Sequence, residues 1–448
     1  MITANPDQDY VLKTIEGRDV HFIRCWFSDT LGSLKSFALI SNDIEQAFEE
    51  GINFDGTRIE GFNSPQRYDM LAFPDASTFQ VLPWRPDSDA VARMFCSISN
   101  PDGSPFEGDS RFILKKMIDR AAERGYIFNV CPMPEFYYFK DPHKTEVLDS
   151  GGYFDLTSLD SGSDLRRETV LTLEKLGIPV DFSHHETGPS QHEIDLRYSD
   201  ALSMADAVMT YKLVVKEIAL KNGVYASFMP KPMAKHTGSA MHIQQSLSDL
   251  NGNNLFFDAH ATRDKCLSEI AKHYIAGLLK YAPEYTLITN QYVNSYKRLS
   301  TDNDAPIFLS WSTSKKQSLI RVPHFRPEKE SSSRIELRSP DPAANPYLAF
   351  AVLLAAGLKG IEEKLPLEPA DESHDFSFTN RRELIQQGFS LVPQHLGEAI
   401  EHFSTSSLMK EVLGKHIHSY LVDAKRAEWE SYLGEISPWE LDRYLAVL

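Results

Sequence analysis

Two glutamates and three histidines lie close together in the stretch 184–193, around a Gly-Pro pair. Because Gly188-Pro189 cannot continue a helix, the sequence predicts a loop between two strands that turns Glu186 and Glu193 toward one point. Two carboxylates about 4 Å apart repel each other by roughly 4 kcal/mol at an effective dielectric of about 20. A cation that prefers oxygen ligands, Mg²⁺ or Mn²⁺, would relieve this repulsion. A solvated acidic loop without a ligand is the alternative.

Several other segments carry charged, glycine and proline residues in a characteristic order. In the first half and the centre of the chain these are 54–56, 228–232, 238–242 and 294–299. Toward the C-terminal end they are 334–338, 340–347, 437–440 and 443–445. Together with 184–193, these segments resemble the glutamine synthetase family of the bacterial type I. The resemblance runs along nearly the whole chain.

This resemblance implies an α+β fold with two domains. A small N-terminal β-grasp domain would cover residues 10–104, and a larger catalytic α/β domain with an open barrel-like sheet would cover 105–448. Members of the family usually form a homododecamer of two stacked hexamers, with each active site between neighbouring subunits. The family reaction uses ATP and Mg²⁺ or Mn²⁺: the γ-carboxyl of glutamate is phosphorylated, and ammonia or an amine attacks the acyl phosphate.

That chemistry needs divalent cations beside the triphosphate, arginines beside phosphoryl and carboxylate groups, and an acidic pocket that takes protons from an ammonium. The residues that match the first metal site are Glu135, Glu186 and Glu193, and those that match the second are His242 and Glu336. Glutamate contacts are matched by Arg298 and Gly238, phosphoryl contacts by Arg321 and Arg338, and nucleotide contacts by Ser246, Lys316 and Arg334. The ammonium site is matched by Asp55, Tyr153 and the flap residue Asp304.

The chain departs from the family pattern at several of these places. Met133 stands two residues before Glu135, where the family has a glutamate, and methionine is a poor ligand for a hard cation. Either water or phosphate replaces the missing oxygen and the metal binds more weakly, or phosphoryl transfer is impaired. The other replacements are Thr237 for asparagine, Ala240 for glycine, Gln244 for histidine and Lys316 for arginine.

Two further departures concern the amine. Thr57-Arg58 stands where two serines are usual, and Asp304 is one methylene shorter than the flap glutamate of the family. A cation near an ammonium pocket disfavours NH₄⁺, and a shorter acid leaves more room, so we expect an amine larger than ammonia. In the alternative interpretation, Arg58 turns outward and pairs with Glu60. A glutamine synthetase that uses ammonia and a degenerate family member with a binding or structural role are the other two hypotheses.

The bulk composition excludes some partners. A net charge of −17 over 448 residues leaves no basic surplus for nucleic acid or an anionic membrane, although a local basic pocket for a small anion stays possible. The scattered cysteines indicate neither a zinc site nor disulfides. Without a signal-peptide pattern or a membrane-spanning run, we expect a cytoplasmic protein. The segment 371–376, where the family has its adenylylated tyrosine, contains none.

The elements that must position these residues follow from periodicity and end signals. The sequence predicts strands over 20–27 and 128–139 and helices over 42–50, 111–124, 202–222, 261–281 and 345–363. We expect Ser110 to cap the helix at 111–124, and the stretch 203–206 to form a capping box at the start of the helix at 202–222.

Overall fold

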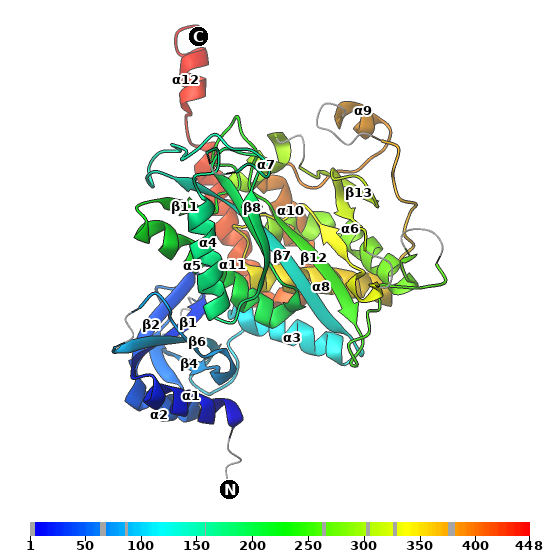
Figure 1. Ribbon diagram of the computed structural model, residues 1–448. Coiled ribbons are helices and arrows are strands. Elements are labelled where there is room, and N and C mark those ends of the chain that lie inside the picture. Colours follow the sequence, from blue (N-terminus) through cyan, green and yellow to red (C-terminus); the bar gives the residue numbers. More distant parts are fainter. Residues whose placement is uncertain are drawn as a thin grey trace.

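The computed structural model describes residues 5–62, 69–85, 88–156, 158–261, 266–301, 305–325, 329–374 and 381–448. Its N-terminal part is built on one sheet with the strand order β2-β1-β6-β4-β3, and β5 pairs with β6. The strands are β1 (Val20–Ser28), β2 (Leu34–Ile40), β3 (Ile52–Asp55), β4 (Asp69–Pro74), β5 (Gln80–Val81) and β6 (Ala90–Ser99). Helices α1 (Pro6–Gly17) and α2 (Ile44–Glu50) lie on one side of this sheet, at the bottom of Figure 1. The parallel central pair β1–β6, flanked by antiparallel strands, agrees with the expected β-grasp domain.

The second sheet is larger and mostly antiparallel, with the strand order β13-β14-β15-β12-β7-β9-β8 and with β10 and β11 paired to β7. Its strands are β7 (Ile127–Phe139), β8 (Val180–His185), β9 (Gln191–Leu196), β10 (Ser199–Asp200), β11 (Tyr225–Ser227), β12 (Met241–Ser248), β13 (Phe308–Ser312), β14 (Ser318–Arg321) and β15 (Ile335–Leu337). β7 pairs along its length with β10, β12, β9 and β11, and so holds the sheet together. This open, curled sheet confirms the expected catalytic α/β architecture.

Helices cover the larger sheet and carry most of the apolar core (Figure 1). They are α3 (Ser110–Ala122), α4 (Ser163–Lys175), α5 (Ala201–Lys221), α6 (Glu269–Thr289), α7 (Val293–Thr301), α8 (Pro346–Glu362), α9 (Arg381–Gln386), α10 (Leu396–Thr405), α11 (Ser407–Leu433) and α12 (Pro438–Tyr444). α8 is apolar on all sides and buried along almost its whole length, as its composition predicts. Asn345 caps the first turn of α8. Pro346 occupies the first helical position, where a backbone N–H would have no partner within the helix.

The expected caps of two helices are wrong by a few residues. α3 is capped by Asp109, whose side chain accepts from Arg111 N, while Ser110 is already inside the helix. α5 is capped by Asp200, which accepts from Ser203 N, so no capping box forms at 203–206. In both places an aspartate just before the expected residue is the N-cap and accepts a hydrogen bond from a free backbone N–H group. A carboxylate is a stronger acceptor than a hydroxyl.

The helix expected at 261–281 begins and ends later, at Glu269–Thr289. Ser268 caps it by accepting from Ala271 N. Pro283 lies inside α6, although proline disfavours a helix interior. The packing of α6 against α8 stabilises the helix despite this residue. The strand at 20–27, the helix ended by Gly51, the strand at 128–139 and the helix at 345–363 are confirmed within one or two residues at most ends.

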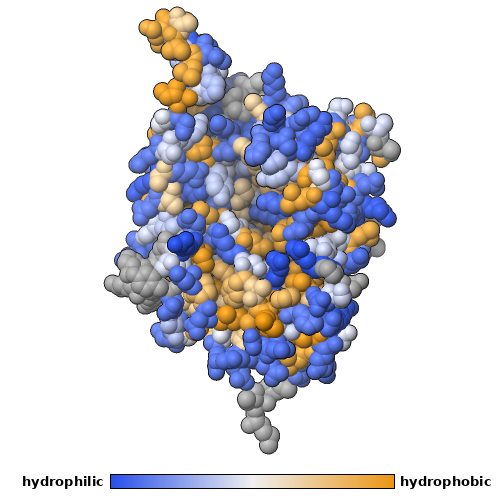
Figure 2. Space-filling view, turned by 90° about the vertical axis from the view of Figure 1, so that its left-hand side faces the viewer, coloured by the Kyte–Doolittle hydropathy of each residue, from blue (hydrophilic) through white to orange (hydrophobic). Residues whose placement is uncertain are grey.

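The last described element, α12, stands clear of the body of the molecule (Figures 1 and 2). Ser437 and Glu440 form a capping box at its start. Its large apolar side chains Trp439, Leu441 and Tyr444 are exposed, and so is Leu445 just after it. In the described parts of the chain no helix is long and apolar enough to cross a membrane.

Candidate active site

A β-hairpin carries the glutamates and histidines of the stretch 184–193. His184 and Glu193 are directly opposite each other on β8 and β9, and only residues 186–190 form the turn, so the expected loop is shorter than predicted. Ligand atoms of His184, Glu186 and Glu193 all lie within 4.8 Å of one another. His184 Nε2 is 2.8 Å from Glu186 Oε1 and 3.9 Å from Glu193 Oε1. The predicted convergence of the two carboxylates is confirmed, and the burial of Glu193 contradicts a solvated acidic loop.

A third carboxylate joins this pair from the neighbouring strand. Glu135 on β7 lies opposite Glu193 in the register of β7 and β9. Its Oε2 accepts from Ala240 N at 2.9 Å and from Gln191 Nε2 at 3.0 Å. Burial and the charge of Glu186 raise the pKa of Glu135 to about 8.

The same forces act on Glu193: burial, then the charges of Asp195 and Glu135, raise its pKa well above its ordinary value. The cluster therefore holds more buried negative charge than its histidine and its hydrogen-bond donors neutralise. The carboxylate oxygens of this cluster converge on one point, and little positive charge lies near them. The cluster therefore fits a hard divalent cation such as Mg²⁺ or Mn²⁺.

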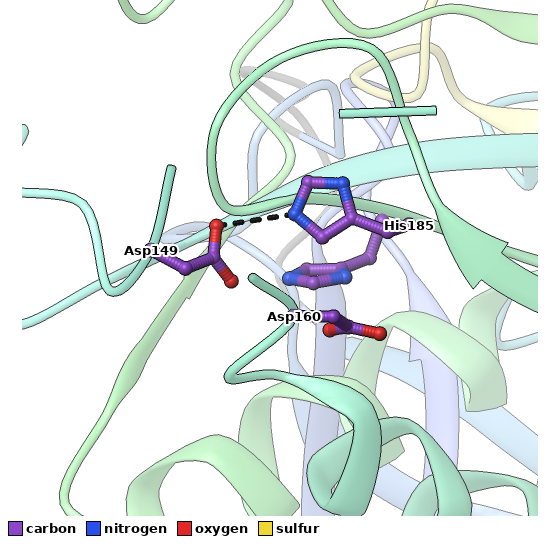
Figure 3. Close-up of side chains that lie close together, drawn as sticks. Asp149, Asp160 and His185 are labelled. Carbon is purple, nitrogen blue, oxygen red and sulfur yellow. Dashed lines mark hydrogen bonds and ion pairs between the residues drawn. The ribbon is translucent and has the colours of Figure 1, made fainter. Parts of the chain in front are cut away.

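Asp149, Asp160, His185 and His192 form a second group of ligand-type side chains, in which the two histidines are paired across β8 and β9. Figure 3 shows Asp149, Asp160 and His185 of this group. Arg166 occupies this group: its guanidinium donates to both oxygens of Asp160 and to His192 Nδ1. Because Arg166 and His185 balance the charges of Asp160 and Asp149, we interpret this group as a buried support rather than a metal centre, although His192 Nε2 has no hydrogen-bond partner among the described residues.

His185 connects this support to the turn. Its Nδ1 lies 2.6 Å from Glu186 O and its Nε2 3.1 Å from Asp149 Oδ1. Although burial lowers the pKa of His185, these hydrogen bonds raise it above its ordinary value. Both ring nitrogens therefore donate, which fixes the backbone next to the Glu186 carboxylate.

Strands β12 and β15 supply the second expected ligand pair. His242 lies opposite Met133, and Gln244 lies opposite Glu336. Burial and the charge of Arg338 hold the pKa of His242 well below its ordinary value, so its ring is neutral and able to act as a ligand. Gln244 Nε2 is 3.3 Å from Glu336 Oε2 and 3.8 Å from the Met133 sulfur.

Cations surround Glu336. Arg338 forms an ion pair with it, and Arg321 Nη1 is 3.8 Å from its Oε1. Arg334 Nε donates to Gln244 Oε1 at 2.5 Å, which places this guanidinium at the same edge of the sheet. Arg298 is buried, and it donates to Ser339 O at 2.7 Å and to Arg338 O at 3.1 Å. A cluster with this excess of positive charge suits a phosphate or carboxylate.

One cavity of about 640 Å³ brings these groups together. The residues that match a site role in the family and line it are Glu135, Tyr153, Glu186, Glu193, Gly238, His242, Arg298, Lys316, Arg321, Arg334, Glu336 and Arg338. The replaced positions Met133, Thr237, Ala240 and Gln244 line it as well. One end of the cavity is acidic, which suits an ammonium, and the other end is basic, which suits a phosphoryl group. The transfer of a phosphoryl group to a carboxylate that lies next to an ammonium requires both. Ser246 is buried in β12 and does not line the cavity.

Comparison with known sequence families gives two matches that together cover most of the chain. Residues 19–101 match the "Glutamine synthetase, beta-Grasp domain" and residues 107–444 match the "Glutamine synthetase, catalytic domain". The chain belongs to the glutamine synthetase family. It is accordingly an ATP-dependent glutamate ligase.

Relatives within the glutamine synthetase family match over the full length. A protein named glutamine synthetase from Mycolicibacterium smegmatis is 48% identical, covering 98% of this chain and 99% of the relative. A glutamine synthetase from Methanosarcina mazei is 47% identical, covering 98% and 97%. Among solved structures, "Apo GmaS without ligand" matches with a TM-score of 0.86 at 28% identity, covering 96% of this chain and 98% of that one.

Two residues that the sequence predicts near the amine lie outside the cavity of their own chain. Asp55 and Arg58 are in the N-terminal domain and do not line the cavity. The Asp55 carboxylate is exposed, and hydrogen bonds from Thr57 lower its pKa. In the described residues no ion pair joins Arg58 to Glu60, whose carboxylate accepts from the Tyr420 hydroxyl. Asp304, and residues 375–376 of the segment without a tyrosine, lie outside the described residues.

The structure also adds residues that the sequence analysis missed. Asp195 lines the acidic end, and burial raises its pKa to about 6. It follows Glu193 by two positions on β9, so strand alternation could have found it. Phe154 and Phe182 line the same end beside Tyr153, each more than half exposed. No spacing in the sequence marks these rings, because Phe182 comes from strand β8 while Tyr153 and Phe154 come from the loop between β7 and α4.

Proposed function

We propose that this ligase joins the γ-carboxyl of glutamate to an organic amine larger than ammonia. The observation that carries the proposal is the mixed character of the acidic end of the cavity. Tyr153 and Phe154 stack with ring centroids 4.0 Å apart, and both stand edge-on to His184, next to Glu186. Carboxylates attract an ammonium, while half-exposed aromatic faces favour a cation with carbon substituents.

One further feature supports an organic amine. Arg58 adds a cation where the family usually has serine, and it lies outside the cavity of its own chain. At the acidic end of a neighbouring copy's cavity, it would disfavour a bare ammonium ion. A glutamine synthetase proper is the second candidate, because the relatives at 46–48% identity carry that name.

The residues of this chain support a two-step reaction. The guanidinium groups of Arg321 and Arg338 face the region where charge develops as a glutamate γ-carboxylate oxygen attacks the γ-phosphorus of ATP and ADP leaves. Divalent cations held by the carboxylates and His242 would neutralise the triphosphate. The amine then attacks the acyl carbon, phosphate leaves, and a nearby carboxylate takes the proton.

We further propose that Asp55 serves the cavity of a neighbouring copy in a homododecamer of two stacked hexamers. Asp55 and Arg58 are exposed on the N-terminal domain, outside their own chain's cavity. The exposed apolar side chains of α12, which project from the body in Figure 2, support an assembly that buries them.

The experiment that tests the amine is phosphate release with ATP, Mg²⁺ and glutamate against a panel of amines. The panel contains ammonium, methylamine, ethanolamine, a polyamine and benzylamine. We expect one organic amine to give at least ten times the kcat/KM of ammonium. Ammonium as the best acceptor would make the enzyme a glutamine synthetase and contradict the proposal.

A further inference from the structure

A second cavity, larger than the active site, lies between the two domains. Its volume is about 820 Å³, and we call it the lysine cavity because Lys212, Lys216 and Lys297 line it. Lys212 and Lys216 are one turn apart on α5, so their side chains leave the same face of the helix. Apolar residues and the Phe228 ring form the rest of its wall on that side.

The charges of the two α5 lysines are not neutralised by protein. Among the described residues no carboxylate lies within 4.0 Å of either ammonium. Lys212 Nζ donates to Ala344 O at 3.2 Å, and Lys216 Nζ lies 5.8 Å from the centre of the Phe228 ring. Glu428, the carboxylate of the cavity wall, is already engaged, since it accepts from Lys425 Nζ at 2.9 Å and from Val293 N at 3.0 Å.

This excess of positive charge is unusual in a chain with a net charge of −17. Burial and the neighbouring charge of Lys216 lower the pKa of Lys212 to about 7, and burial also lowers the pKa of Lys216. Lys212 is half-buried and Lys216 is exposed, so a ligand that brings negative charge can reach both side chains, and its charge would favour the protonated form of Lys212.

We propose that the lysine cavity binds a small organic anion whose carboxylate or phosphate group lies between Lys212 and Lys216 and whose apolar body rests against the Phe228 ring. Lysine ammonium groups recognise either anion as point charges, and the ring and aliphatic wall exclude water around the body of the ligand. This site is distinct from the active site, because the two cavities share no lining residue.

The same elements nevertheless contribute residues to the walls of both cavities. α7 contributes Val293 and Lys297 to the lysine cavity and Arg298 to the active site. The segment from Pro230 to Gly238 separates them, and Ser239 N donates to Pro230 O at 2.8 Å across it. An anion in the lysine cavity therefore acts on elements that position the glutamate-facing side of the active site, and we expect it to change the KM for glutamate.

The test is a calorimetric titration of the full-length protein with phenyl phosphate and with benzoate, and with phenol as the uncharged control. The two anions separate a phosphate site from a carboxylate site. The variants are Lys212→Met and Lys216→Gln. The matched control is Lys280→Gln, an exposed lysine that is paired with Glu363 and lines neither cavity. Because Lys216 is exposed, K216Q keeps the test decisive even if K212M does not fold.

We expect one anion to bind saturably, phenol not to bind, and each lysine variant to weaken binding at least tenfold while K280Q leaves it unchanged. Binding that both variants leave unchanged would place the anion elsewhere and overturn the proposal. Equal binding of phenol would show an apolar cavity without an anion site. If neither anion binds, the proposal is also wrong. A neighbouring copy that fills the cavity in the assembled protein would give this result. None of these outcomes depends on which amine the ligase uses.

Discussion

Met133 places a thioether beside His242, Gln244 and Glu336, where an oxygen ligand would complete the nucleotide end of the cavity. Met133→Glu adds that oxygen on the same strand face. We expect it to lower the Mg²⁺ concentration for half-maximal activity by about tenfold, the scale on which a single group near a metal changes its affinity. Met133→Leu, which keeps the apolar volume, should leave the Mg²⁺ dependence unchanged. An equal Mg²⁺ requirement in M133E would mean that this end of the cavity binds no metal.

Glu135 predicts how stability responds to pH when metal is removed. Its pKa is about 8 in the folded protein and near 4.5 when unfolded, so between these values the folded state binds more protons. Stability therefore falls as pH rises from about 5 to 8, by up to roughly 1.4 kcal/mol per pH unit for one proton. Thermal unfolding in a chelator should show this fall. Saturating Mg²⁺ should raise the midpoint more at pH 8 than at pH 5. Glu135→Gln should make the fall in the chelator smaller, while the raised pKa values of Glu193 and Asp195 keep part of it.

At the scale of elements, the sequence was most informative where one local pattern dominated. The uniformly apolar run of α8 and the glycine-ended α2 formed as predicted because nothing in the tertiary structure competes with them. The start of α6 was misplaced, because its cap Ser268 follows several residues whose composition is also compatible with a helix. The convergence of Glu186 and Glu193 was predicted from one stretch, whereas Asp195 and the aromatic rings depended on sheet register and on a loop that meets strand β8 only in the fold.

The crossing of α6 and α8 depends on glycines at the contact. A Cβ on Gly277 would lie 2.2 Å from Ala356 O and 2.8 Å from Gly360 Cα. Gly277→Ala should therefore force the helices apart and destabilise the protein by about 1–3 kcal/mol, visible as a lower thermal midpoint. The control is Gly17→Ala, where a new Cβ meets nothing within 4 Å. An unchanged midpoint in G277A would show that the two helices can move apart without loss.

At the scale of the whole molecule, the position of Asp55 could not be predicted from one chain, because its proposed partner residues belong to another copy. Chains with Asp55→Ala and chains with Arg338→Ala should each lose at least a hundredfold in activity while assembling normally. Mixed at equal amounts during refolding, they should regain about a quarter of wild-type activity. If each site takes its N-terminal domain from a neighbour, one site in about four receives both native residues.

The result depends only on where the two residues meet. If Asp55 served its own chain's cavity, every site in a mixed ring would carry one of the two defects, and mixing would restore nothing. Size-exclusion chromatography of the separate and mixed samples confirms that assembly is equal, and a mixture of Arg338→Ala with Glu193→Gln, both in one cavity, supplies the negative control. Recovery in the first mixture and none in the second would establish an active site built from two copies, and would explain why Asp55 is exposed in the single chain.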